Sequence, residues 1–326
     1  MTSALLALAL ALPAGAASRA KTAKGPAYGI LILAYGVGGS WRKDLGTLRT
    51  QLKGHAIESV ERVEGSPDGV GVQRALDKLL NQRVGKVVAV PLVTLAESPA
   101  VDEARYLFGI REEPVTDRPD AQQKEMKAPR SALKSALVLP PDGRRLKRLA
   151  SKVPLVLAAT IDRSPVLAEI LADRAKALSR DPARDAVVLI GVGPRSDVAL
   201  AAWKTAAAAV AEQVRRKGGF RKAAVAAVRS GVRAGQQDKD REELRATFRA
   251  LIGEGGTVIV VPLAPDGSLV ERMLKRDLGF AAYRWDGKGL LGDRRLLDWV
   301  AAAAEAASKL PDVRQYKDAT AMGGLR

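Results

Sequence analysis

The sequence predicts an α/β protein built from two similar halves, each a parallel sheet flanked by helices, that face each other across a cleft. Short apolar runs alternate with segments of helical periodicity, which is the pattern of parallel βαβ units. The pattern also recurs, since "GILILAYG" returns as "AVVLIGVG" and "KVVAVPL" returns as "TVIVVPL". Two blocks that recur in the same order indicate an internal repeat, with one half formed by each copy.

Strands and helices alternate through the first half. The apolar run Ile30–Ala34 predicts the first strand, and the glycines that follow Tyr35 predict a tight turn into a helix. The same spacing rules predict the remaining elements: a helix through Leu45, Leu48 and Leu52, a strand at 57–63, a helix through Val70, Leu76 and Leu79, a strand at 87–93 and a helix at 99–109.

A charged, proline-rich segment separates the two halves. After it, "VPLVLAATID" predicts a strand, and Ser164-Pro165 predicts the start of a helix, with serine as the N-cap and proline at the first position. The predicted organisation is a signal peptide at 1–17, a basic linker at 18–28, a first half at 29–110, a connection with one or two helical pieces at 111–152, a second half at 153–310 and a C-terminal tail at 311–326.

The first 17 residues resemble a secretory signal peptide. Ala4–Leu12 are uniformly apolar, Pro13 ends the stretch, and Ala14-Gly15-Ala16 offers a small-x-small cleavage site, although no Lys or Arg precedes the stretch. The stretch is too short to span a bilayer. We expect a mature protein that starts near Ala17 in the periplasm or outside the cell; a cytoplasmic protein with a frayed N-terminal tail is the alternative.

Composition excludes several kinds of site. The 326-residue chain has no cysteine, which excludes disulfides, thiolate zinc sites and cysteine nucleophiles. Its single histidine, His55, argues against metal sites built from two or three imidazoles. The net charge of +17 raises the local concentration of anions, which are nucleic acid, anionic lipid or polycarboxylate substrates, with a solvated Arg/Lys-rich surface as the alternative. No basic run is interleaved with aromatic residues, so we do not expect nucleic acid to bind.

The glycine turn after the first strand does not match a nucleotide motif. Gly36 and Gly38 fit the first two positions of Gly-x-Gly-x-x-Gly, but Trp41 stands at the third. No lysine follows in the register of a P-loop. The turn lies where a parallel sheet collects its ligands, at the carboxyl ends of the strands, so it belongs to the candidate site without being a nucleotide loop.

Together these blocks resemble the class II chelatases, which insert cobalt or iron into sirohydrochlorin, in their long two-repeat form. The resemblance rests on "ILILAYG" with its repeat "VVLIGVG", on "VVAVPLVTLAESPAVDEARYLFG", on "ATIDRSPVLAEILADRAKALS" and more weakly on "YRWDGKGLLGDRRLLDWV". It covers roughly 29–109 and 153–300. The resemblance implies an anionic tetrapyrrole as ligand, divalent cobalt or iron as the metal, and lyase activity if the family's function persists.

The family's metal-site histidines are missing from this chain. The resemblance implies histidines that bind metal and accept the pyrrole protons, and Tyr35 and Glu97 stand at two of those positions, with Ser164 and Val192 at two more. The candidate catalytic residues are therefore Tyr35 and Glu97, the candidate metal ligand is Glu97, and we predict no histidine site. The candidate substrate-binding residues are Gly36, Ser98, Ser164 and Arg195.

The replacements weaken the chemistry that the resemblance implies. A phenol is a poor base at neutral pH because its reference pKa is about 10, and oxygen ligands without imidazole favour harder ions than cobalt.

Arg195 could bind a substrate carboxylate through two hydrogen bonds, with an ordinary surface arginine as the alternative. We expect His55 to be a solvated loop residue. Three interpretations stay open: a degenerate relative that binds a tetrapyrrole or similar polyanion, an active divergent metallochelatase, and a structural or partner-binding module.

Overall fold

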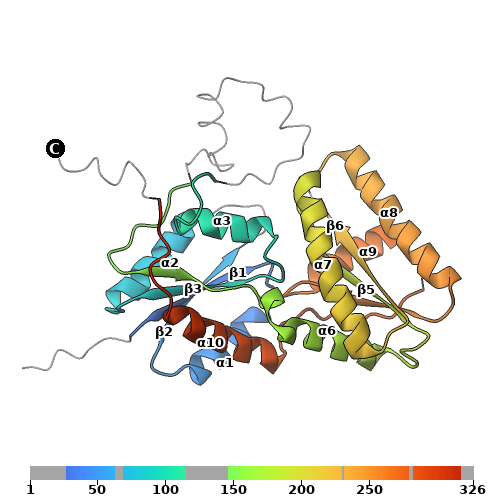
Figure 1. Ribbon diagram of the computed structural model, residues 1–326, viewed down its shortest axis with the longest axis horizontal. Coiled ribbons are helices and arrows are strands. Elements are labelled where there is room, and N and C mark those ends of the chain that lie inside the picture. The colour runs from blue at the N-terminus through green and yellow to red at the C-terminus, as the bar shows by residue number, and fades with distance from the viewer. Residues whose placement is uncertain (1–26, 63–68, 115–145, 230, 279–281, 317–326) are drawn as a thin grey trace, which may run out of the picture.

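Two parallel sheets, each covered by helices on both faces, lie side by side in the molecule (Figure 1). The structure is a computed structural model and describes residues 27–62, 69–114, 146–229, 231–278 and 282–316. The α/β architecture with two similar halves, which the sequence predicts, is confirmed.

Sheet A, the sheet of the first half, contains four parallel strands in the order β2-β1-β3-β4. Its apolar strands are buried on both faces, as parallel sheets require. Leu31 and Leu33 pack against α2 and α3, whereas Ile30 and Ile32 pack with α1 and α10. The elements of this half are β1 (Gly29–Tyr35), α1 (Trp41–Gln51), β2 (Ala56–Arg62), α2 (Gly69–Asn81), β3 (Val87–Leu92), α3 (Pro99–Leu107) and β4 (Leu155–Leu157).

Sheet B, the sheet of the second half, has its three parallel strands in the order β6-β5-β7. This order repeats β2-β1-β3, which confirms the duplication that the sequence predicts. Val187 and Leu189 face α6 and α7, and Val188 and Ile190 face α8 and α9. The elements are β5 (Ala186–Val192), α7 (Asp197–Gly218), β6 (Lys222–Val228), α8 (Ala234–Gly253), β7 (Val258–Pro262) and α9 (Ser268–Leu278).

Strand register repeats along with strand order. Ile30 lies opposite Val88 in sheet A, and Val187 lies opposite Ile259 in sheet B. Val88 in turn pairs with Val156 of β4, and Ile259 forms a single bridge with Arg284. The chain around Arg284 is thus the remnant of a fourth strand in sheet B.

The helix after each fourth strand crosses to the other half. After a short 3-10 turn at Ile161–Arg163, α6 (Pro165–Leu178) packs on α7 and β7, although it follows β4 of sheet A. Helix α10 (Arg294–Ser308) follows the second half and packs on β3, β4 and α1. The sequence analysis places β4 and α10 within the second half, whereas the structure assigns β4 to sheet A and α10 to the cover of that sheet.

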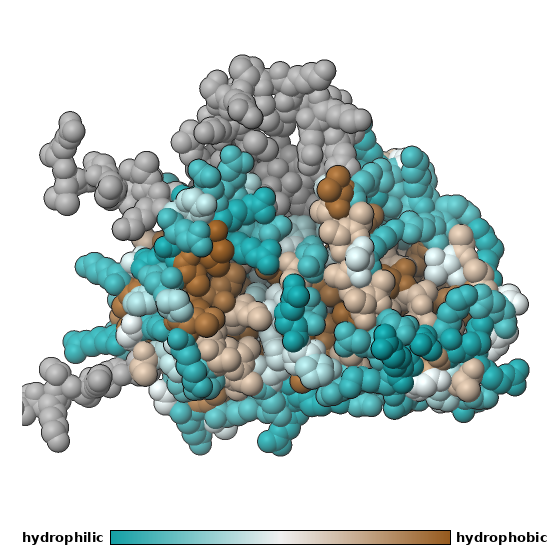
Figure 2. Space-filling model, in the orientation of Figure 1, coloured by the Kyte–Doolittle hydropathy of each residue, from teal (hydrophilic) through white to brown (hydrophobic). Residues whose placement is uncertain are grey.

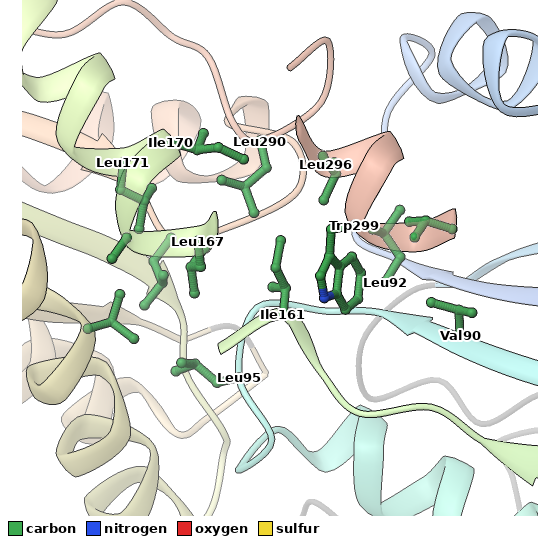
Figure 3. Packing of buried hydrophobic residues seen from close by; sticks show 14 of the residues in the cluster. Val90, Leu92, Leu95, Ile161, Leu167, Ile170, Leu171, Leu290, Leu296 and Trp299 are labelled. Atoms are coloured by element: carbon green, nitrogen blue, oxygen red, sulfur yellow. The ribbon is translucent and has the colours of Figure 1, made fainter. Parts of the chain in front are cut away.

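One apolar core runs through both halves as a consequence of this exchange. Figure 3 shows Trp299 of α10 between Ile161 and Leu92 of β3, with Leu167 and Leu171 of α6 farther along the same cluster. Trp299 is 8% exposed and the other four are 2% exposed or less. Separating the halves would expose this shared core to water.

The end of the described chain extends along the outer edge of sheet A. The backbone N–H of Val313 donates to Leu155 O (3.0 Å), and the N–H groups of Gln315 and Tyr316 donate to Gly109 O (2.9 and 3.2 Å). The predicted signal peptide and most of the 111–152 connection, with its expected helical pieces, lie outside the described residues. Across the described part, no helix is both long and apolar enough to cross a membrane.

The loop before β7 contains two adjacent glycines with left-handed backbone, Gly255 (φ 82°) and Gly256 (φ 83°). A Cβ on Gly256 would lie 1.9 Å from Arg184 O, whereas a Cβ on Gly255 would meet nothing within 4 Å. Gly255→Ala should lower the free energy of unfolding by about 1–2 kcal/mol through backbone strain alone. Gly256→Ala should lower the free energy of unfolding by about 1–3 kcal/mol more than Gly255→Ala does, because the added Cβ would collide with the Arg184 carbonyl oxygen. Urea denaturation of the two variants measures the difference, and equal losses would contradict it.

Asp185, beside the start of β5, makes the free energy of unfolding depend on pH. Its carboxylate accepts hydrogen bonds from Ser179 Oγ (2.6 Å) and Thr257 N (2.8 Å). Burial raises the pKa of Asp185, but these hydrogen bonds outweigh it and the net shift is downward. A carboxyl group with a lowered pKa stabilises the fold above its unfolded pKa of about 4, and that contribution is lost as pH falls further.

We therefore expect Asp185→Asn to be less stable than the unaltered protein at pH 7, with a gap that narrows as pH is lowered from 5 to about 3. The exposed Asp238, whose side chain is 67% exposed, provides the control. Asp238→Asn removes an exposed carboxylate that pairs with Arg241 (3.0 Å) and should lower the free energy of unfolding at pH 7 by less than about 1 kcal/mol. Urea denaturation at each pH measures both, and a gap for Asp185→Asn that stays constant would show that the carboxylate does not contribute in this way.

Candidate functional site

The carboxyl edges of the two sheets meet at the centre of the molecule. Thr94, in the loop after β3, donates from Oγ1 to Leu263 O, in the loop after β7 (3.3 Å). Gly38, in the loop after β1, lies so close to Asp266 that a Cβ would be 2.3 Å from the carboxylate oxygen. Parallel sheets bind their ligands at this edge, and the repeat brings two such edges together.

Helix N-termini converge on the same edges. Most of the described helices directly follow a parallel strand, so they begin where that strand ends, and their first N–H groups carry partial positive charge. Ser98, Ser164 and Ser196 cap α3, α6 and α7 by accepting hydrogen bonds from backbone N–H groups two or three residues ahead. The N-termini of these helices therefore favour a negatively charged group of a ligand.

Tyr35 lies in the core of the first half. Its side chain is packed with Leu31 and Leu33 against α2 and α3, and the residue is 3% exposed. The guanidinium carbon of Arg62 lies 5.5 Å from the centre of its ring. The next residue, Gly36, is exposed, has φ 60° and donates its N–H to Arg62 O (3.0 Å). Gly36 is thus exposed at the carboxyl end of β1, while the Tyr35 side chain is buried.

Arg62 forms a buried ion pair with Glu103 of α3, which the sequence analysis missed. The two side chains are 1% and 9% exposed. The pair joins the end of β2 to α3. No spacing rule links these residues, because they lie 41 positions apart in different elements.

Glu97 lies in the loop between β3 and α3, next to the loop that precedes α6. Its side chain is 34% exposed, and Oε1 lies 3.9 Å from Arg163 Nη2. The N–H of Ala96 donates to Asp162 Oδ2 (3.3 Å), which ties the two loops together. One oxygen of Glu97 and one of Asp162 are buried without a hydrogen-bond partner. Asp162 is thus a second carboxylate here. It is the Asp of "DRSP" in the block "ATIDRSPVLAEILADRAKALS", which the sequence analysis quotes without naming Asp162 as a candidate.

Ser98 and Ser164 both serve as N-caps. The Ser98 hydroxyl accepts from Ala100 N (3.2 Å), and the Ser164 hydroxyl accepts from Val166 N (3.3 Å). Ser98 is 2% exposed, whereas Ser164 is half-buried. These contacts give each serine a structural role, and binding of substrate by either one stays a prediction.

Arg195 precedes α7 at the carboxyl edge of sheet B, and a buried arginine holds its loop. Arg229, whose side chain is 1% exposed, donates to Arg195 O (3.1 Å), to Asp197 (2.7 Å) and through two bonds to Asp240 (2.6 and 2.8 Å). Burial lowers the pKa of Arg229, but the bonds to Asp240 and Asp197 outweigh it and the net shift is upward. The Arg195 side chain itself lies against Gly231.

His55 lies at the amino edge of sheet A, just before β2, and so away from the meeting edges. The expectation that it is a solvated loop residue is wrong in one respect. The residue is half-buried, its ring contacts the Tyr28 ring in a tilted arrangement with 4.5 Å between centroids, and Nδ1 is buried without a hydrogen-bond partner. The contact with the Tyr28 ring covers part of the His55 side chain.

The candidate residues do not assemble a transition-metal site. Within the residues that the structure describes, no three His, Cys, Asp or Glu side chains are placed so that they could hold a metal ion. Glu97 and Asp162 are two carboxylates on neighbouring loops, while Tyr35 is in the core. Cobalt and iron sites in proteins generally use imidazole together with other ligands, so the donor set here does not fit them.

A separate groove of about 740 Å³ opens on the first half between α2 and residues 150–153. Leu80, Val84 and Val153 line it together with Asp77 and Lys152. Val84 contacts Gly29 at the first residue of β1, so the groove lies at the amino edge of sheet A. Ligand sites of parallel sheets lie at the opposite edge, and we do not assign the groove to the functional site.

The fold has a counterpart among solved structures. SirB from Bacillus subtilis with Fe³⁺ has a TM-score of 0.53 and 13% sequence identity over 87% of this chain and 99% of that chain. A solute-binding protein of an ABC transporter from Rhodopseudomonas palustris BisB5, in complex with 3,4-dihydroxybenzoic acid, has 14% identity over 88% of this chain and 76% of that one, but its TM-score of 0.25 supports no argument. No family model and no curated protein matches the sequence.

The likeness to SirB covers nearly the whole of that chain and most of this one. At this level of identity it concerns the fold and not the chemistry. This chain has a chelatase-like fold.

Proposed function

We propose that this protein is a divergent relative of the sirohydrochlorin chelatases that binds an anionic tetrapyrrole, or a similar polyanion, between its two halves and does not insert metal. The observation that carries the proposal is the meeting of two carboxyl edges, each lined by helix N-termini, in a chelatase-like fold. A tetrapyrrole with several carboxylates matches the positive field of those helix ends.

The donor set favours binding over insertion. Insertion requires ligands that hold the metal ion briefly and bases that remove two pyrrole protons, and imidazole is suited to both tasks. Here Tyr35 is buried in the core, and Glu97 and Asp162 are two carboxylates on neighbouring loops with no imidazole beside them. The second candidate, an active metallochelatase, is favoured only by the half-exposed Glu97 beside Asp162. The third, a partner-binding module, has no specific observation in its favour.

Titration of the protein with sirohydrochlorin, followed by absorbance, tests the proposal. We expect saturable binding in the absence of metal. Arg195→Ala should weaken it by about tenfold, or about 1.4 kcal/mol, because a charged hydrogen bond to a ligand carboxylate is lost. Arg216→Ala is the matched control, since Arg216 is an exposed arginine at the far end of α7 whose side chain is 71% exposed.

Binding that is absent from the unaltered protein would contradict the proposal. Equal affinity in all three proteins would leave tetrapyrrole binding in place and remove Arg195 from the site. Export of the protein is a separate prediction, and it rests on residues outside the described part of the chain.

A further inference from the structure

The exchanged helices α6 and α10 have a mechanical consequence. We infer that they lock the two halves into one rigid body, so that the distance between the two meeting carboxyl edges stays fixed and a ligand binds there without hinge opening. The inference concerns the meeting edges of the proposed function and rests on that function only for the choice of probe.

The apolar contacts of both exchanged helices oppose opening. Helix α10 contributes Leu296, Trp299 and Val300 to the shared core, and α6 contributes Leu167 and Ile170. None of these residues is more than 8% exposed. A hinge motion that moved either sheet away from its borrowed helix would return these side chains to water, which is strongly unfavourable.

Polar contacts from the first half fix α10 at both ends. At its start, Asp44 of α1 accepts a hydrogen bond from Gly292 N (2.7 Å). At its end, Lys86 Nζ donates to the carbonyl oxygens of Ser308 (2.7 Å) and Leu310 (2.8 Å). The Ser308 carbonyl is among those that a helix leaves unpaired at its C-terminus, and Leu310 lies just past the C-cap Lys309, so the lysine both caps the helix and ties it to sheet A.

Tyr28 adds a further bond near the same end of α10. Its hydroxyl donates to Glu305 Oε2 (3.0 Å). Burial, together with the bond to Glu305, raises the pKa of Tyr28 to about 12. The phenol therefore keeps its proton, and the bond persists, across the pH range in which the protein would be handled.

Helix α6 is held in the corresponding way by the second half. Arg284, at the fourth-strand position of sheet B, donates from Nη1 to Leu178 O at the end of α6 (2.8 Å). Lys217 of α7 pairs with Glu169 (3.2 Å). The two exchanged helices also contact each other, with Arg295 of α10 within 2.6 Å of the Asp173 carboxylate.

The crossover segments leave little room for a hinge. A hinge needs a few residues whose backbone can rotate freely, and here the chain crosses between halves at 158–164 and 285–293. The first crossover is tied by the bond from Ala96 N to Asp162. In the second, Leu290 N donates to Ala264 O and Leu291 N donates to Pro265 O, both at 3.0 Å. A Cβ on Gly289 would lie 2.3 Å from Pro265 O, so this crossover is packed against the loop after β7.

The absence of cysteine allows a direct test with pairs of spin labels. Arg74→Cys in α2 and Ala246→Cys in α8 place labels on exposed positions of the two halves. Arg74→Cys with Thr50→Cys in α1 places both labels on the first half and supplies the reference width. Distances are measured by pulsed electron resonance in the free protein and with saturating sirohydrochlorin.

We expect one narrow distance distribution across the halves, as narrow as the reference, with a shift on adding sirohydrochlorin of less than about 2 Å, the range of pre-organised complexes. A second population, a distribution broader than the reference, or a larger shift would overturn the inference. If sirohydrochlorin does not bind, the distance distribution of the free protein alone tests the rigid arrangement of the halves. A narrow distribution then supports the rigid arrangement while the failed binding counts against the proposed function, so the two failures are distinguishable.

Discussion

Replacing Trp299 by alanine should lower the free energy of unfolding by about 3–5 kcal/mol, the usual cost of removing a large aromatic side chain from a core. Trp299 is 8% exposed and lies on α10 against the first half, between Ile161 and Leu92 (Figure 3). Loss of this side chain leaves a cavity at the point where the halves share their core. Because that core joins both sheets, both halves should lose stability in a single transition.

Val198→Ala supplies the control for this substitution. Val198 is 79% exposed at the start of α7, and Figure 2 shows a weakly hydrophobic surface over this helix, where alanines are also exposed. Its replacement should change stability by less than about 0.5 kcal/mol. Chemical denaturation followed by tryptophan fluorescence and by circular dichroism measures both variants. A loss of less than 1 kcal/mol for Trp299→Ala, or separate transitions in the unaltered protein, would contradict the shared core.

Arg229→Met should be the second most damaging substitution, with a loss of about 3–5 kcal/mol in the free energy of unfolding. The guanidinium is buried, and its removal leaves the carboxylate of Asp240, 15% exposed, without the two hydrogen bonds that it accepts. The loop that presents Arg195 also loses its anchor, because Arg229 holds the Arg195 carbonyl.

A double change separates the charge effect from the packing effect. Arg229→Met together with Asp240→Leu removes both charges and should recover most of the lost stability, since apolar pairs often replace buried ion pairs at little cost. Arg249→Ala breaks a pair with Glu242 whose side chains are 65% and 61% exposed, and should cost less than about 1 kcal/mol. If the double variant were no more stable than Arg229→Met, the loss would not come from an unpaired buried charge.

Sequence reasoning predicts the repeated part of the fold well, and the reason is visible in the strands. The apolar runs at 30–34 and 187–191 are buried on both faces, and such runs carry a strong strand signal. The repeat then fixes strand order and register, which the structure reproduces as Ile30 opposite Val88 and Val187 opposite Ile259. Trp203 of α7 lies in the core and is 2% exposed.

The exchange of helices could not be predicted in the same way. Helical periodicity shows that α10 has an apolar face, but it does not show which sheet that face covers. Trp299 would fit a helix on either half. The helix is assigned to sheet A only by its contacts with β3 and β4, by the hydrogen bond that Asp44 accepts from Gly292 N, and by the hydrogen bond that Lys86 donates to Ser308 O.

The sequence predicts where the candidate residues lie in the fold better than it predicts which side chains they contact. Gly36, Glu97, Ser164 and Arg195 follow strand ends, so their place at the carboxyl edges comes directly from parallel topology. The burial of Tyr35 follows from strand alternation, because it has the same parity as Leu31 and Leu33 and faces α2 and α3 with them. The buried partners Glu103 and Asp240 could not be found, since arginine and carboxylate side chains are exposed by default and these pairs span different elements.

The rate of cobalt insertion into sirohydrochlorin tests the central claim most directly. Absorbance spectra distinguish free, protein-bound and metallated sirohydrochlorin, so one experiment with and without protein follows binding and insertion together. We expect the protein to shift the spectrum of sirohydrochlorin without metal and to leave the rate of cobalt insertion no faster than in buffer. Insertion accelerated in proportion to protein concentration would contradict a binding protein that lacks the donor set for metal, and an unchanged spectrum without metal would contradict the ligand itself.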